Sequence, residues 1–179
     1  GAIETTARQA EAERGCVATS SLGRVFDAAA FLLGLCRENR HEAEAAMAVE
    51  AAAGGISAEA YPYCTTFAGR IVRMSLAPTI ECMVHDVAAG ADVGAIAARF
   101  HETVARMLAA TAMMACETNK LSTVAISGGC FANRRLLGRL VELLERRRLK
   151  VLFNRAVPIG DGGVSLGQAV AAEAMFRCE

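Results

Sequence analysis

Apolar residues recur at helical spacing through most of the chain. One clear stripe follows residues 19–21, a Thr-Ser-Ser run whose hydroxyl groups can cap a helix. Its apolar positions are Leu22, Val25, Phe26, Ala29, Leu33 and Cys36. Asp27 lies off this stripe, in the second turn. We predict further helices over residues 1–15 and 42–53, the second of which ends at the glycine pair 54–55.

A longer stripe predicts a long helix that begins after Asp92, whose carboxylate can cap it. Its buried face would carry Val93, Ile96, Phe100, Val104, Met107, Leu108, Thr111 and Met114. Residues 56–90 show no clear period, because a Tyr-Pro-Tyr run at 61–63 interrupts any regular element and 67–76 fits a strand or a helix equally. We expect short irregular segments there, followed by a helix over 77–89.

The last sixty residues have a different pattern. Leu121–Ile126 and Lys150–Phe153 are short apolar runs that contain β-branched residues, and each leads through a glycine pair into a helical pattern. Two such units in tandem predict neighbouring parallel strands covered by helices. We therefore expect one α/β domain over residues 1–179, with more helix than sheet.

Composition narrows the class of protein. The chain is 54% hydrophobic and 21% charged and has no formal net charge, which is typical of a folded domain and not of one that binds nucleic acid over its whole surface. We find no membrane span or secretory signal. The seven cysteines include no CxxC pair and lie mostly in apolar runs, so we expect buried, reduced thiols in a cytoplasmic protein.

The glycine pairs mark the place where a ligand is expected, beyond the carboxyl ends of the strands. Gly128 and Gly129 would let a phosphate approach the backbone, since no Cβ intervenes. The helix that starts near Asn133 would direct unpaired amides toward the same space, and the Asn133 side chain could contact a ribose or a base. A tight turn is the alternative for this segment. Asp161, which follows Gly160, could bind a metal ion, cap a helix or occupy a turn.

Other candidate chemistry is weaker. His41, His85 and His101 lack the one-turn spacing that places two imidazoles on one helix face. No nucleophile and base can be paired with confidence. The region 134–150 is basic, which indicates a solvated helix face, with an RNA-contacting patch as the alternative.

Three segments together resemble a known family. Residues 19–28 (TSSLGRVFDA) resemble the TSSxGRxFDA stretch of HypF-type hydrogenase maturation proteins. Residues 127–134 (SGGCFANR) are similar to their SGGCFxNR element, and residues 158–169 (PIGDGGVSLGQA) to their PxNDGGxxLGQA ending. The chain departs at Gly160, where the family has Asn, and at residues 41–46 (HEAEAA), where the family has YEGxAA.

The resemblance implies a helix-rich α/β fold, one lobe of an actin-like, sugar-kinase-like nucleotide-binding architecture. HypF-type enzymes make carbamoyl-adenylate from carbamoyl phosphate and ATP in a YrdC-like domain. A second domain, related to tRNA threonylcarbamoyl transferases, passes the carbamoyl group to the C-terminal cysteine of HypE during nickel–iron hydrogenase maturation. The chain would be the second lobe of that domain. Its partners would be the first lobe, the YrdC-like domain and HypE, and the chain alone is expected to be inactive.

The resemblance also implies roles for individual residues. The nucleotide or substrate contacts would be Gly23, Asp27, Gly128, Gly129 and Asn133. Asp161 would bind a divalent metal ion, iron or zinc, whose other ligands are two histidines of the first lobe. The nucleophile would belong to HypE. The alternatives are a lobe of a tRNA threonylcarbamoyl transferase, a small-molecule O-carbamoyltransferase, or a non-catalytic lobe that docks partners.

Overall fold

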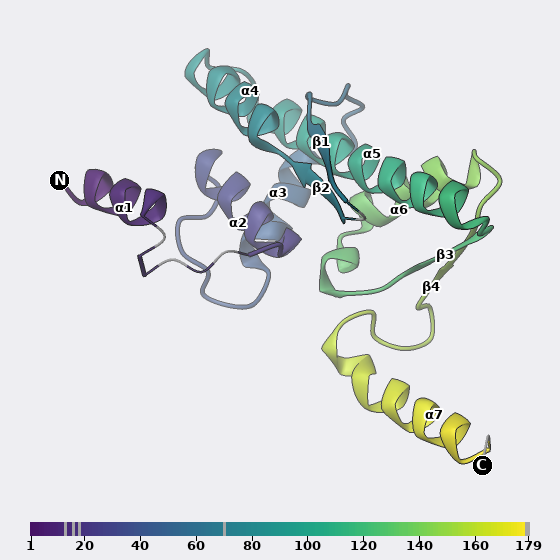
Figure 1. Cartoon of the computed structure of the whole chain (residues 1–179). Coiled ribbons are helices and arrows are strands. Elements are labelled where there is room, and N and C mark those ends of the chain that lie inside the picture. The colour runs from purple at the N-terminus through teal and green to yellow at the C-terminus, as the bar shows by residue number, and fades with distance from the viewer. Residues whose placement is uncertain (13, 16, 18, 70, 178–179) are drawn as a thin grey trace.

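The fold is a helical body with a small parallel sheet on one side (Figure 1). The computed structural model describes all residues except 13, 16, 18, 70 and 178–179. The helices are α1 (Ala2–Glu11), α2 (Leu22–Leu32), α3 (Glu44–Ala53), α4 (Ala77–Ala88), α5 (Val93–Asn119), α6 (Arg134–Glu145) and α7 (Val164–Phe176). The strands are β1 (Cys64–Ala68), β2 (Ile71–Ser75), β3 (Thr123–Ile126) and β4 (Lys150–Phe153). Short 3₁₀ segments, η1 (Gly129–Ala132) and η2 (Asp161–Gly163), follow β3 and β4.

The long helix α5 organises the body, because α3, α4 and α6 all pack against it. The predicted cap is confirmed: the Asp92 side chain accepts a hydrogen bond from the Ala95 amide at 2.8 Å. The main core includes Phe26, Val49, Ile96, Phe100, Val104 and Leu136. Helices α3 and α5 approach closely at Gly94, where a Cβ would lie 2.8 Å from the Ala52 carbonyl oxygen.

The predicted parallel pair is confirmed. Strand β3 pairs with β4 in parallel register, from Thr123 opposite Lys150 to Ile126 opposite Phe153. Leu140 and Leu144 of α6 pack with Ile126 in a second core beneath this pair. Both strands therefore deliver the residues after their carboxyl ends to one edge of the sheet.

The expectation of irregular structure before α4 is wrong, because β1 and β2 form an antiparallel hairpin. The turn includes Gly69, whose φ of +62° suits glycine. Residues 64–67 of β1 are exposed, and β2 has one half-buried residue and four exposed ones. Alternation of polar and apolar positions, the usual signal for a strand, is therefore absent here. The helix expected over 77–89 is confirmed as α4.

The helix starts differ in two places from the expectation. Ser21 is the N-cap of α2, but its side chain makes no capping hydrogen bond. Helix α3 begins at Glu44, two residues later than predicted, because Ala43 has a left-handed φ of +61°. The YEGxAA pattern places glycine at this position, and the left-handed conformation explains that glycine.

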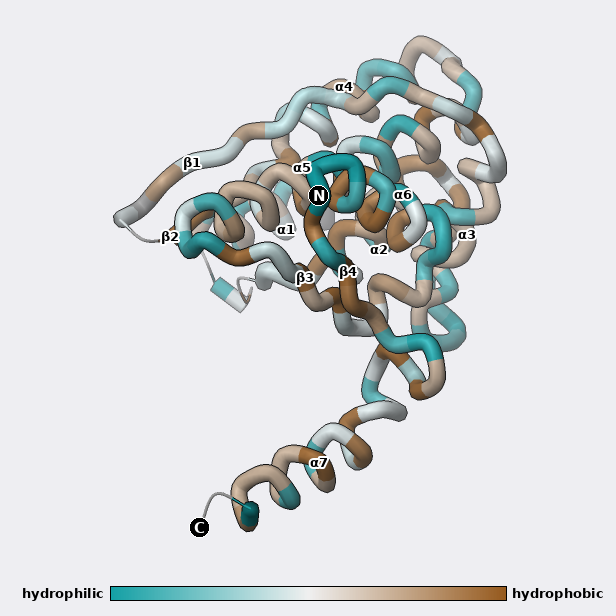
Figure 2. Tube along the Cα trace, turned by 90° about the vertical axis from the view of Figure 1, so that its right-hand side faces the viewer, coloured by the Kyte–Doolittle hydropathy of each residue, from teal (hydrophilic) through white to brown (hydrophobic). Residues whose placement is uncertain are grey.

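Helix α7 extends away from the body with mixed apolar and polar residues around it (Figure 2). None of its residues is buried, and Val164, Leu166, Val170, Met175 and Phe176 are each at least half exposed. Among the described residues, no helix is both long and apolar enough to cross a membrane. The described cysteines are free thiols, but of these only Cys116 is buried, so the expected burial is wrong for the others.

Candidate functional site

The two glycine segments that follow β3 and β4 meet at the edge of the sheet. The Gly128 amide donates a hydrogen bond to the Ile159 carbonyl oxygen at 2.9 Å. A Cβ on Gly160 would lie 3.6 Å from the Cα atom of Gly129, so the two backbones are in contact. Residues about thirty positions apart in the sequence therefore form one continuous loop surface, which we call the glycine edge (residues 127–133 and 158–163).

Glycine is required at this edge for different reasons at different positions. Gly128 has a φ of +114°, which L residues rarely adopt, and a Cβ on Gly128 or Gly129 would meet open space. A Cβ on Gly163, in contrast, would lie 2.5 Å from the Pro158 carbonyl oxygen. The first pair thus borders an open space that a ligand can enter, and Gly163 permits the tight turn of its own loop.

The amides at this edge are not those predicted. Helix α6 was expected to direct unpaired amides toward a ligand, but the Arg135 amide donates to Glu50 Oε1 at 3.2 Å and the Leu136 amide to Asn133 Oδ1 at 2.8 Å. That expectation is wrong for both amides. The first amides of η1, those of Gly129 and Cys130, have no acceptor within their own helix and are the better candidates for an anion.

Asn133 is engaged inside the protein at both ends of its side chain. It is the N-cap of α6 and is 7% exposed. Its Oδ1 accepts from the Leu136 amide, and its Nδ2 lies 2.9 Å from Nε2 of the buried His101. The structure thus gives Asn133 a positioning role, and its predicted contact with a nucleoside would require these bonds to change.

Helix α2 brings the other predicted residues beside the glycine edge. A Cβ on Gly23 would lie 3.9 Å from Cys130 Sγ in η1. Asp27 Oδ1 accepts a hydrogen bond from Asn39 Nδ2 at 3.2 Å. Asp27 Oδ2 is buried. It forms an ion pair with Arg24 Nη2 at 2.8 Å, but it has no hydrogen-bond partner. Asp27 Oδ2 therefore keeps an unused capacity to accept a hydrogen bond.

Cys130 lies between these elements but is a poor nucleophile. Burial, and then the negative charge of Asp27, raise the pKa of the Cys130 thiol. A thiol with a raised pKa carries little thiolate at neutral pH. Cys130 therefore contributes packing between η1 and α2.

Asp161 begins η2 and is exposed. No group of three His, Cys, Asp or Glu side chains suited to a metal ion occurs among the residues that the structure describes. One carboxylate does not complete a metal site, so the described residues alone do not fit the metal ion that the family resemblance implies.

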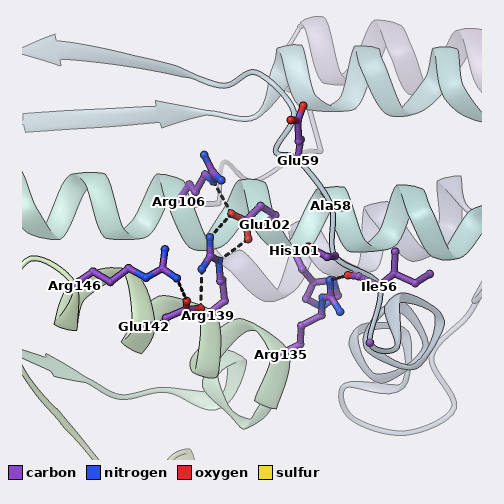
Figure 3. A pocket seen from close by; sticks show the side chains of 12 residues that line it. Ile56, Ala58, Glu59, His101, Glu102, Arg106, Arg135, Arg139, Glu142 and Arg146 are labelled. Atoms are coloured by element: carbon purple, nitrogen blue, oxygen red, sulfur yellow. Dashed lines mark hydrogen bonds and ion pairs between the residues drawn. The ribbon is translucent and has the colours of Figure 1, made fainter.

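A groove of about 770 Å³ lies elsewhere, between residues 55–59, α5 and α6 (Figure 3). None of the glycine-edge residues lines it. Its arginines are already paired: Arg135 donates to the carbonyl oxygens of Ala53, Gly54 and Ile56 at the end of α3. We give more weight to the glycine edge, because the Cβ positions of Gly128 and Gly129 meet open space, whereas the arginines of the groove bind groups within the protein.

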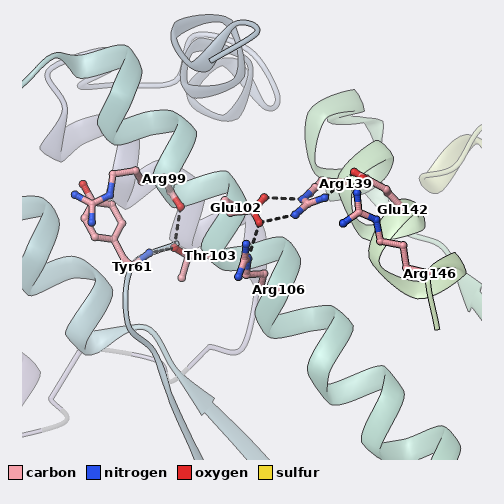
Figure 4. A network of polar contacts seen from close by, with 8 residues as sticks. All are labelled: Tyr61, Arg99, Glu102, Thr103, Arg106, Arg139, Glu142 and Arg146. Atoms are coloured by element: carbon pink, nitrogen blue, oxygen red, sulfur yellow. Dashed lines mark hydrogen bonds and ion pairs between the residues drawn. The ribbon is translucent and has the colours of Figure 1, made fainter. Parts of the chain in front are cut away.

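The polar groups of the groove form a chain that joins α5 to α6 (Figure 4). Arg139 donates to both carboxylate oxygens of Glu102, at 2.7 and 2.8 Å, and Arg106 donates to Glu102 at 2.5 Å. Glu142 in turn accepts from Arg139 and Arg146. The hydrogen bond from Arg139 is the main cause that lowers the pKa of Glu102. Of the predicted basic region, Arg135 and Arg139 therefore join α6 to other elements and Arg146 pairs with a residue of α6, so these three side chains are not a free RNA-binding patch.

Sequence reasoning missed His101 and Glu102. Both lie within a long helix, and their partners Asn133 and Arg139 come from α6, so the contact between α5 and α6 reveals their roles. His85 is exposed, and its Nδ1 lies 3.7 Å from Asp86 Oδ1.

The fold and the glycine edge define a class: a helix-rich α/β lobe of the actin-like, sugar-kinase-like nucleotide-binding architecture. Residues 2–168 match the family described as "Carbamoyltransferase, Kae1-like Domain, second subdomain". The chain is similar to a carbamoyltransferase HypF homolog of Cupriavidus necator, with 38% identity over 96% of the chain and 45% of the relative. It superimposes on the crystal structure of full-length HypF in its phosphate- and nucleotide-bound form with a TM-score of 0.86 and 34% identity, over 97% of this chain and 23% of that one.

A weaker similarity involves half of the chain. A tRNA N6-adenosine threonylcarbamoyltransferase of Acaryochloris marina is 35% identical over 52% of the chain and 25% of the relative. The chain belongs to the HypF carbamoyltransferase family, as the second subdomain of its Kae1-like domain. It spans less than half the length of the curated relatives named here.

Proposed function

We propose that this chain is the nucleotide-facing second lobe of a HypF-type carbamoyltransferase, which transfers the carbamoyl group of carbamoyl-adenylate to the C-terminal cysteine thiol of HypE. The observation that carries the proposal is the meeting of three segments at one edge. The loops after β3 and β4 touch through Gly128 and Ile159, and the start of α2 lies against Cys130. These are the same three segments in which the family resemblance was found.

In the proposed function, the glycine edge and the adjacent start of α2 each have a role. The amides of Gly129 and Cys130 bind the adenylate phosphate, in the space left open by the absent Cβ atoms. Asp27 Oδ2, which forms an ion pair with Arg24 but no hydrogen bond, accepts a hydrogen bond from a ribose hydroxyl. Asp161 supplies one ligand of a metal ion whose remaining ligands come from the first lobe. A metal ion so placed would stabilise negative charge on the phosphate oxygens.

In the proposed reaction, this lobe positions the leaving group. The thiolate sulfur of HypE attacks the carbamoyl carbon, a C–S bond forms, and the C–O bond to the phosphate breaks so that AMP leaves. The thiol proton goes to solvent. Amides fixed at the phosphate stabilise the charge that develops on the leaving group. Because the partner brings the nucleophile, the protonated Cys130 thiol is consistent with this division of work.

Helix α7 supports the view that the lobe works against another surface. Large apolar side chains are exposed along its whole length. Apolar area of this kind on one element is typical of an interaction surface. A first lobe that closes over the glycine edge would also complete the metal ligands and enclose the nucleotide, which the open edge alone does not do.

Calorimetric titration tests the proposal. The chain is titrated with ATP or a non-hydrolysable carbamoyl-adenylate mimic, alone and together with the first-lobe segment of the Cupriavidus necator homolog. We expect binding that requires both pieces. A folded mixture that binds neither compound would overturn the nucleotide role and favour a docking lobe.

A matched glycine pair locates the binding site. Gly129→Ala places a methyl group in the proposed phosphate space and should lower nucleotide affinity at least tenfold. Gly138 also has open space around its Cβ position, but it lies within α6. Gly138→Ala should leave affinity unchanged and stabilise the helix by about 0.5–1 kcal/mol. Equal affinities of the two variants would move the phosphate away from η1.

The molecule that accepts the carbamoyl group distinguishes a HypF-type enzyme from a tRNA-modifying one. Curated HypF relatives match 86–96% of the chain, against 52% for the tRNA enzyme. Arg135, Arg139 and Arg146 are also committed to contacts within the protein. We therefore expect transfer to a HypE C-terminal peptide thiol, and none to tRNA, when the complete enzyme is assayed with each acceptor.

A further inference from the structure

A buried hydrogen-bonded chain links α5 to the glycine edge. His101 is 1% exposed, and its Nδ1 lies 2.8 Å from the Ala97 carbonyl oxygen of its own helix. A carbonyl oxygen only accepts, so Nδ1 carries the proton and Nε2 is an acceptor. The Asn133 amide group 2.9 Å away is then the donor to Nε2. His101 is thus held as one neutral tautomer.

This contact fixes which way the Asn133 amide points. With Nδ2 turned to His101, Oδ1 faces the Leu136 amide and caps α6 at 2.8 Å. The opposite orientation would set the amide NH₂ against the Leu136 N–H and lose the cap. The residue that orients Asn133 therefore also decides whether the first turn of α6 is satisfied.

We propose that His101 is a positioning residue for the glycine edge, where its neutral imidazole holds the Asn133 amide in the orientation that caps α6 and fixes η1 just before it. Asn133 joins the two elements, because its backbone amide donates to the Cys130 carbonyl oxygen at 3.3 Å. Only the description of this edge as nucleotide-facing rests on the proposed function. The positioning itself rests on the hydrogen bonds.

The surroundings of His101 favour the neutral ring. The ring of Phe26 from α2 lies at 5.3 Å and that of Phe100 at 6.1 Å, centroid to centroid. The charged groups that face it are Glu50 from α3 and Arg135 from α6. Burial is the main cause that lowers the pKa of His101. Protonation would set an Nε2–H against the Asn133 NH₂ group and break the contact.

The sign of the pH dependence follows from this shift. An unfolded histidine titrates near 6.5, above the pKa of folded His101. As the pH falls below 6.5, the unfolded chain binds the proton first, so the stability from neutral His101 decreases. It is fully present above that pH and is lost as the pH falls toward the folded pKa.

Two substitutions test the proposal in the full chain. His101→Gln keeps an acceptor near the Nε2 position and cannot be protonated in this pH range, whereas His101→Phe keeps an aromatic ring and removes the acceptor. Hydrogen exchange of the Leu136 amide reports the cap. We expect roughly 3- to 30-fold faster exchange in His101→Phe, the scale of a lost N-cap, and near wild-type exchange in His101→Gln. The Leu144 amide, at the far end of α6, is the internal control.

Two further measurements exclude a merely structural role. The loss of stability between pH 6.5 and 5 should be smaller in His101→Gln than in wild type. In an Asn133→Ser background, whose hydroxyl caps α6 without an amide to orient, His101→Phe should no longer speed exchange at Leu136. Wild-type exchange at Leu136 in a folded His101→Phe protein, or a wild-type pH profile in His101→Gln, overturns the proposal. If His101→Phe does not fold, the pH profile of His101→Gln decides.

None of these measurements uses nucleotide, so the two proposals fail separately. If the wild-type chain with its first lobe binds no nucleotide, but Leu136 amide exchange in the His101 variants changes as expected, the proposed function fails and the positioning role stands. If nucleotide binds and Leu136 exchange is unaffected by both variants, the reverse holds.

Discussion

The two strand–glycine–helix units of this chain begin alike and end differently. In the first, β3 leads through Gly128 and Gly129 to α6, which is capped by Asn133 and buries Leu136, Leu140 and Leu144. In the second, β4 leads through Asp161 to α7, which has no side-chain cap and no buried residue. The strands of the two units are hydrogen-bonded neighbours, so the difference arises after the glycines.

The difference follows from what lies opposite each helix. The apolar positions of α6 form one stripe, and α5 and β3 offer a matching surface within this chain. The exposed apolar residues of α7 meet no such surface. A glycine loop therefore sets where a helix starts, and the partner surface decides whether that helix contributes to the stability of the chain.

The largest expected effect uses a pair of leucines. Leu144 of α6 is 0% exposed and Leu166 of α7 is 50% exposed. Leu144→Ala should destabilise the chain by about 2–5 kcal/mol, because it leaves a cavity. Leu166→Ala should change the free energy of unfolding by less than ~0.5 kcal/mol. Urea unfolding followed by circular dichroism measures both.

The two leucine variants also test whether α7 is exposed in solution. A large loss of stability in Leu166→Ala would mean that α7 packs onto the body in solution. Under the proposed function, Leu166→Ala should instead weaken association with the first lobe, measured by titration of that segment, while Leu144→Ala affects association only through folding.

Glutamates provide the second test. Glu102 accepts from Arg139 and Arg106 and ties α5 to α6, whereas Glu173 of the exposed helix α7 pairs with Arg177, the C-cap of the same helix. Glu102→Gln should cost about 1–3 kcal/mol at neutral pH, since it removes a charged acceptor from two arginines. Glu173→Gln should cost less than ~0.5 kcal/mol.

The lowered pKa of Glu102 determines how its contribution to stability changes at acid pH. Its pKa is lowered from the ordinary value of 4.5. The unfolded chain therefore takes up the proton first, and the stability from this carboxylate, present above pH 4.5, is lost as the pH falls through the folded pKa. The stability of Glu102→Gln should vary less with pH in this range. An unaltered acid profile would show that the arginines do not depend on Glu102.

The sequence predicted those parts of the fold whose residues follow a regular pattern along the chain. The stripe of α5 with its Asp92 cap and the parallel pair of β3 with β4 are of this kind. The hairpin of β1 with β2 was missed, because strands exposed on both faces need no alternation. At the site, the family resemblance implied that Gly23, Asp27 and the glycine segments lie together, but the His101–Asn133 bond depends on how α5 crosses α6.

The smallest expected effect on stability concerns Asp161 and separates folding from ligand binding. The residue is exposed at the first position of η2, directly after the N-cap Gly160. Asp161→Ala should change the free energy of unfolding of this chain by less than ~0.5 kcal/mol. In the complete two-lobed domain it should abolish metal retention, measured by elemental analysis after gel filtration. Asp92→Ala is the contrasting control, because it removes the α5 cap and should cost about 1 kcal/mol without loss of metal. Unchanged metal content in Asp161→Ala would remove the ligand role and leave the carboxylate as an ordinary turn residue. Loss of metal with an intact fold would show that the glycine loop of the second unit serves the ligand and not the stability of the chain.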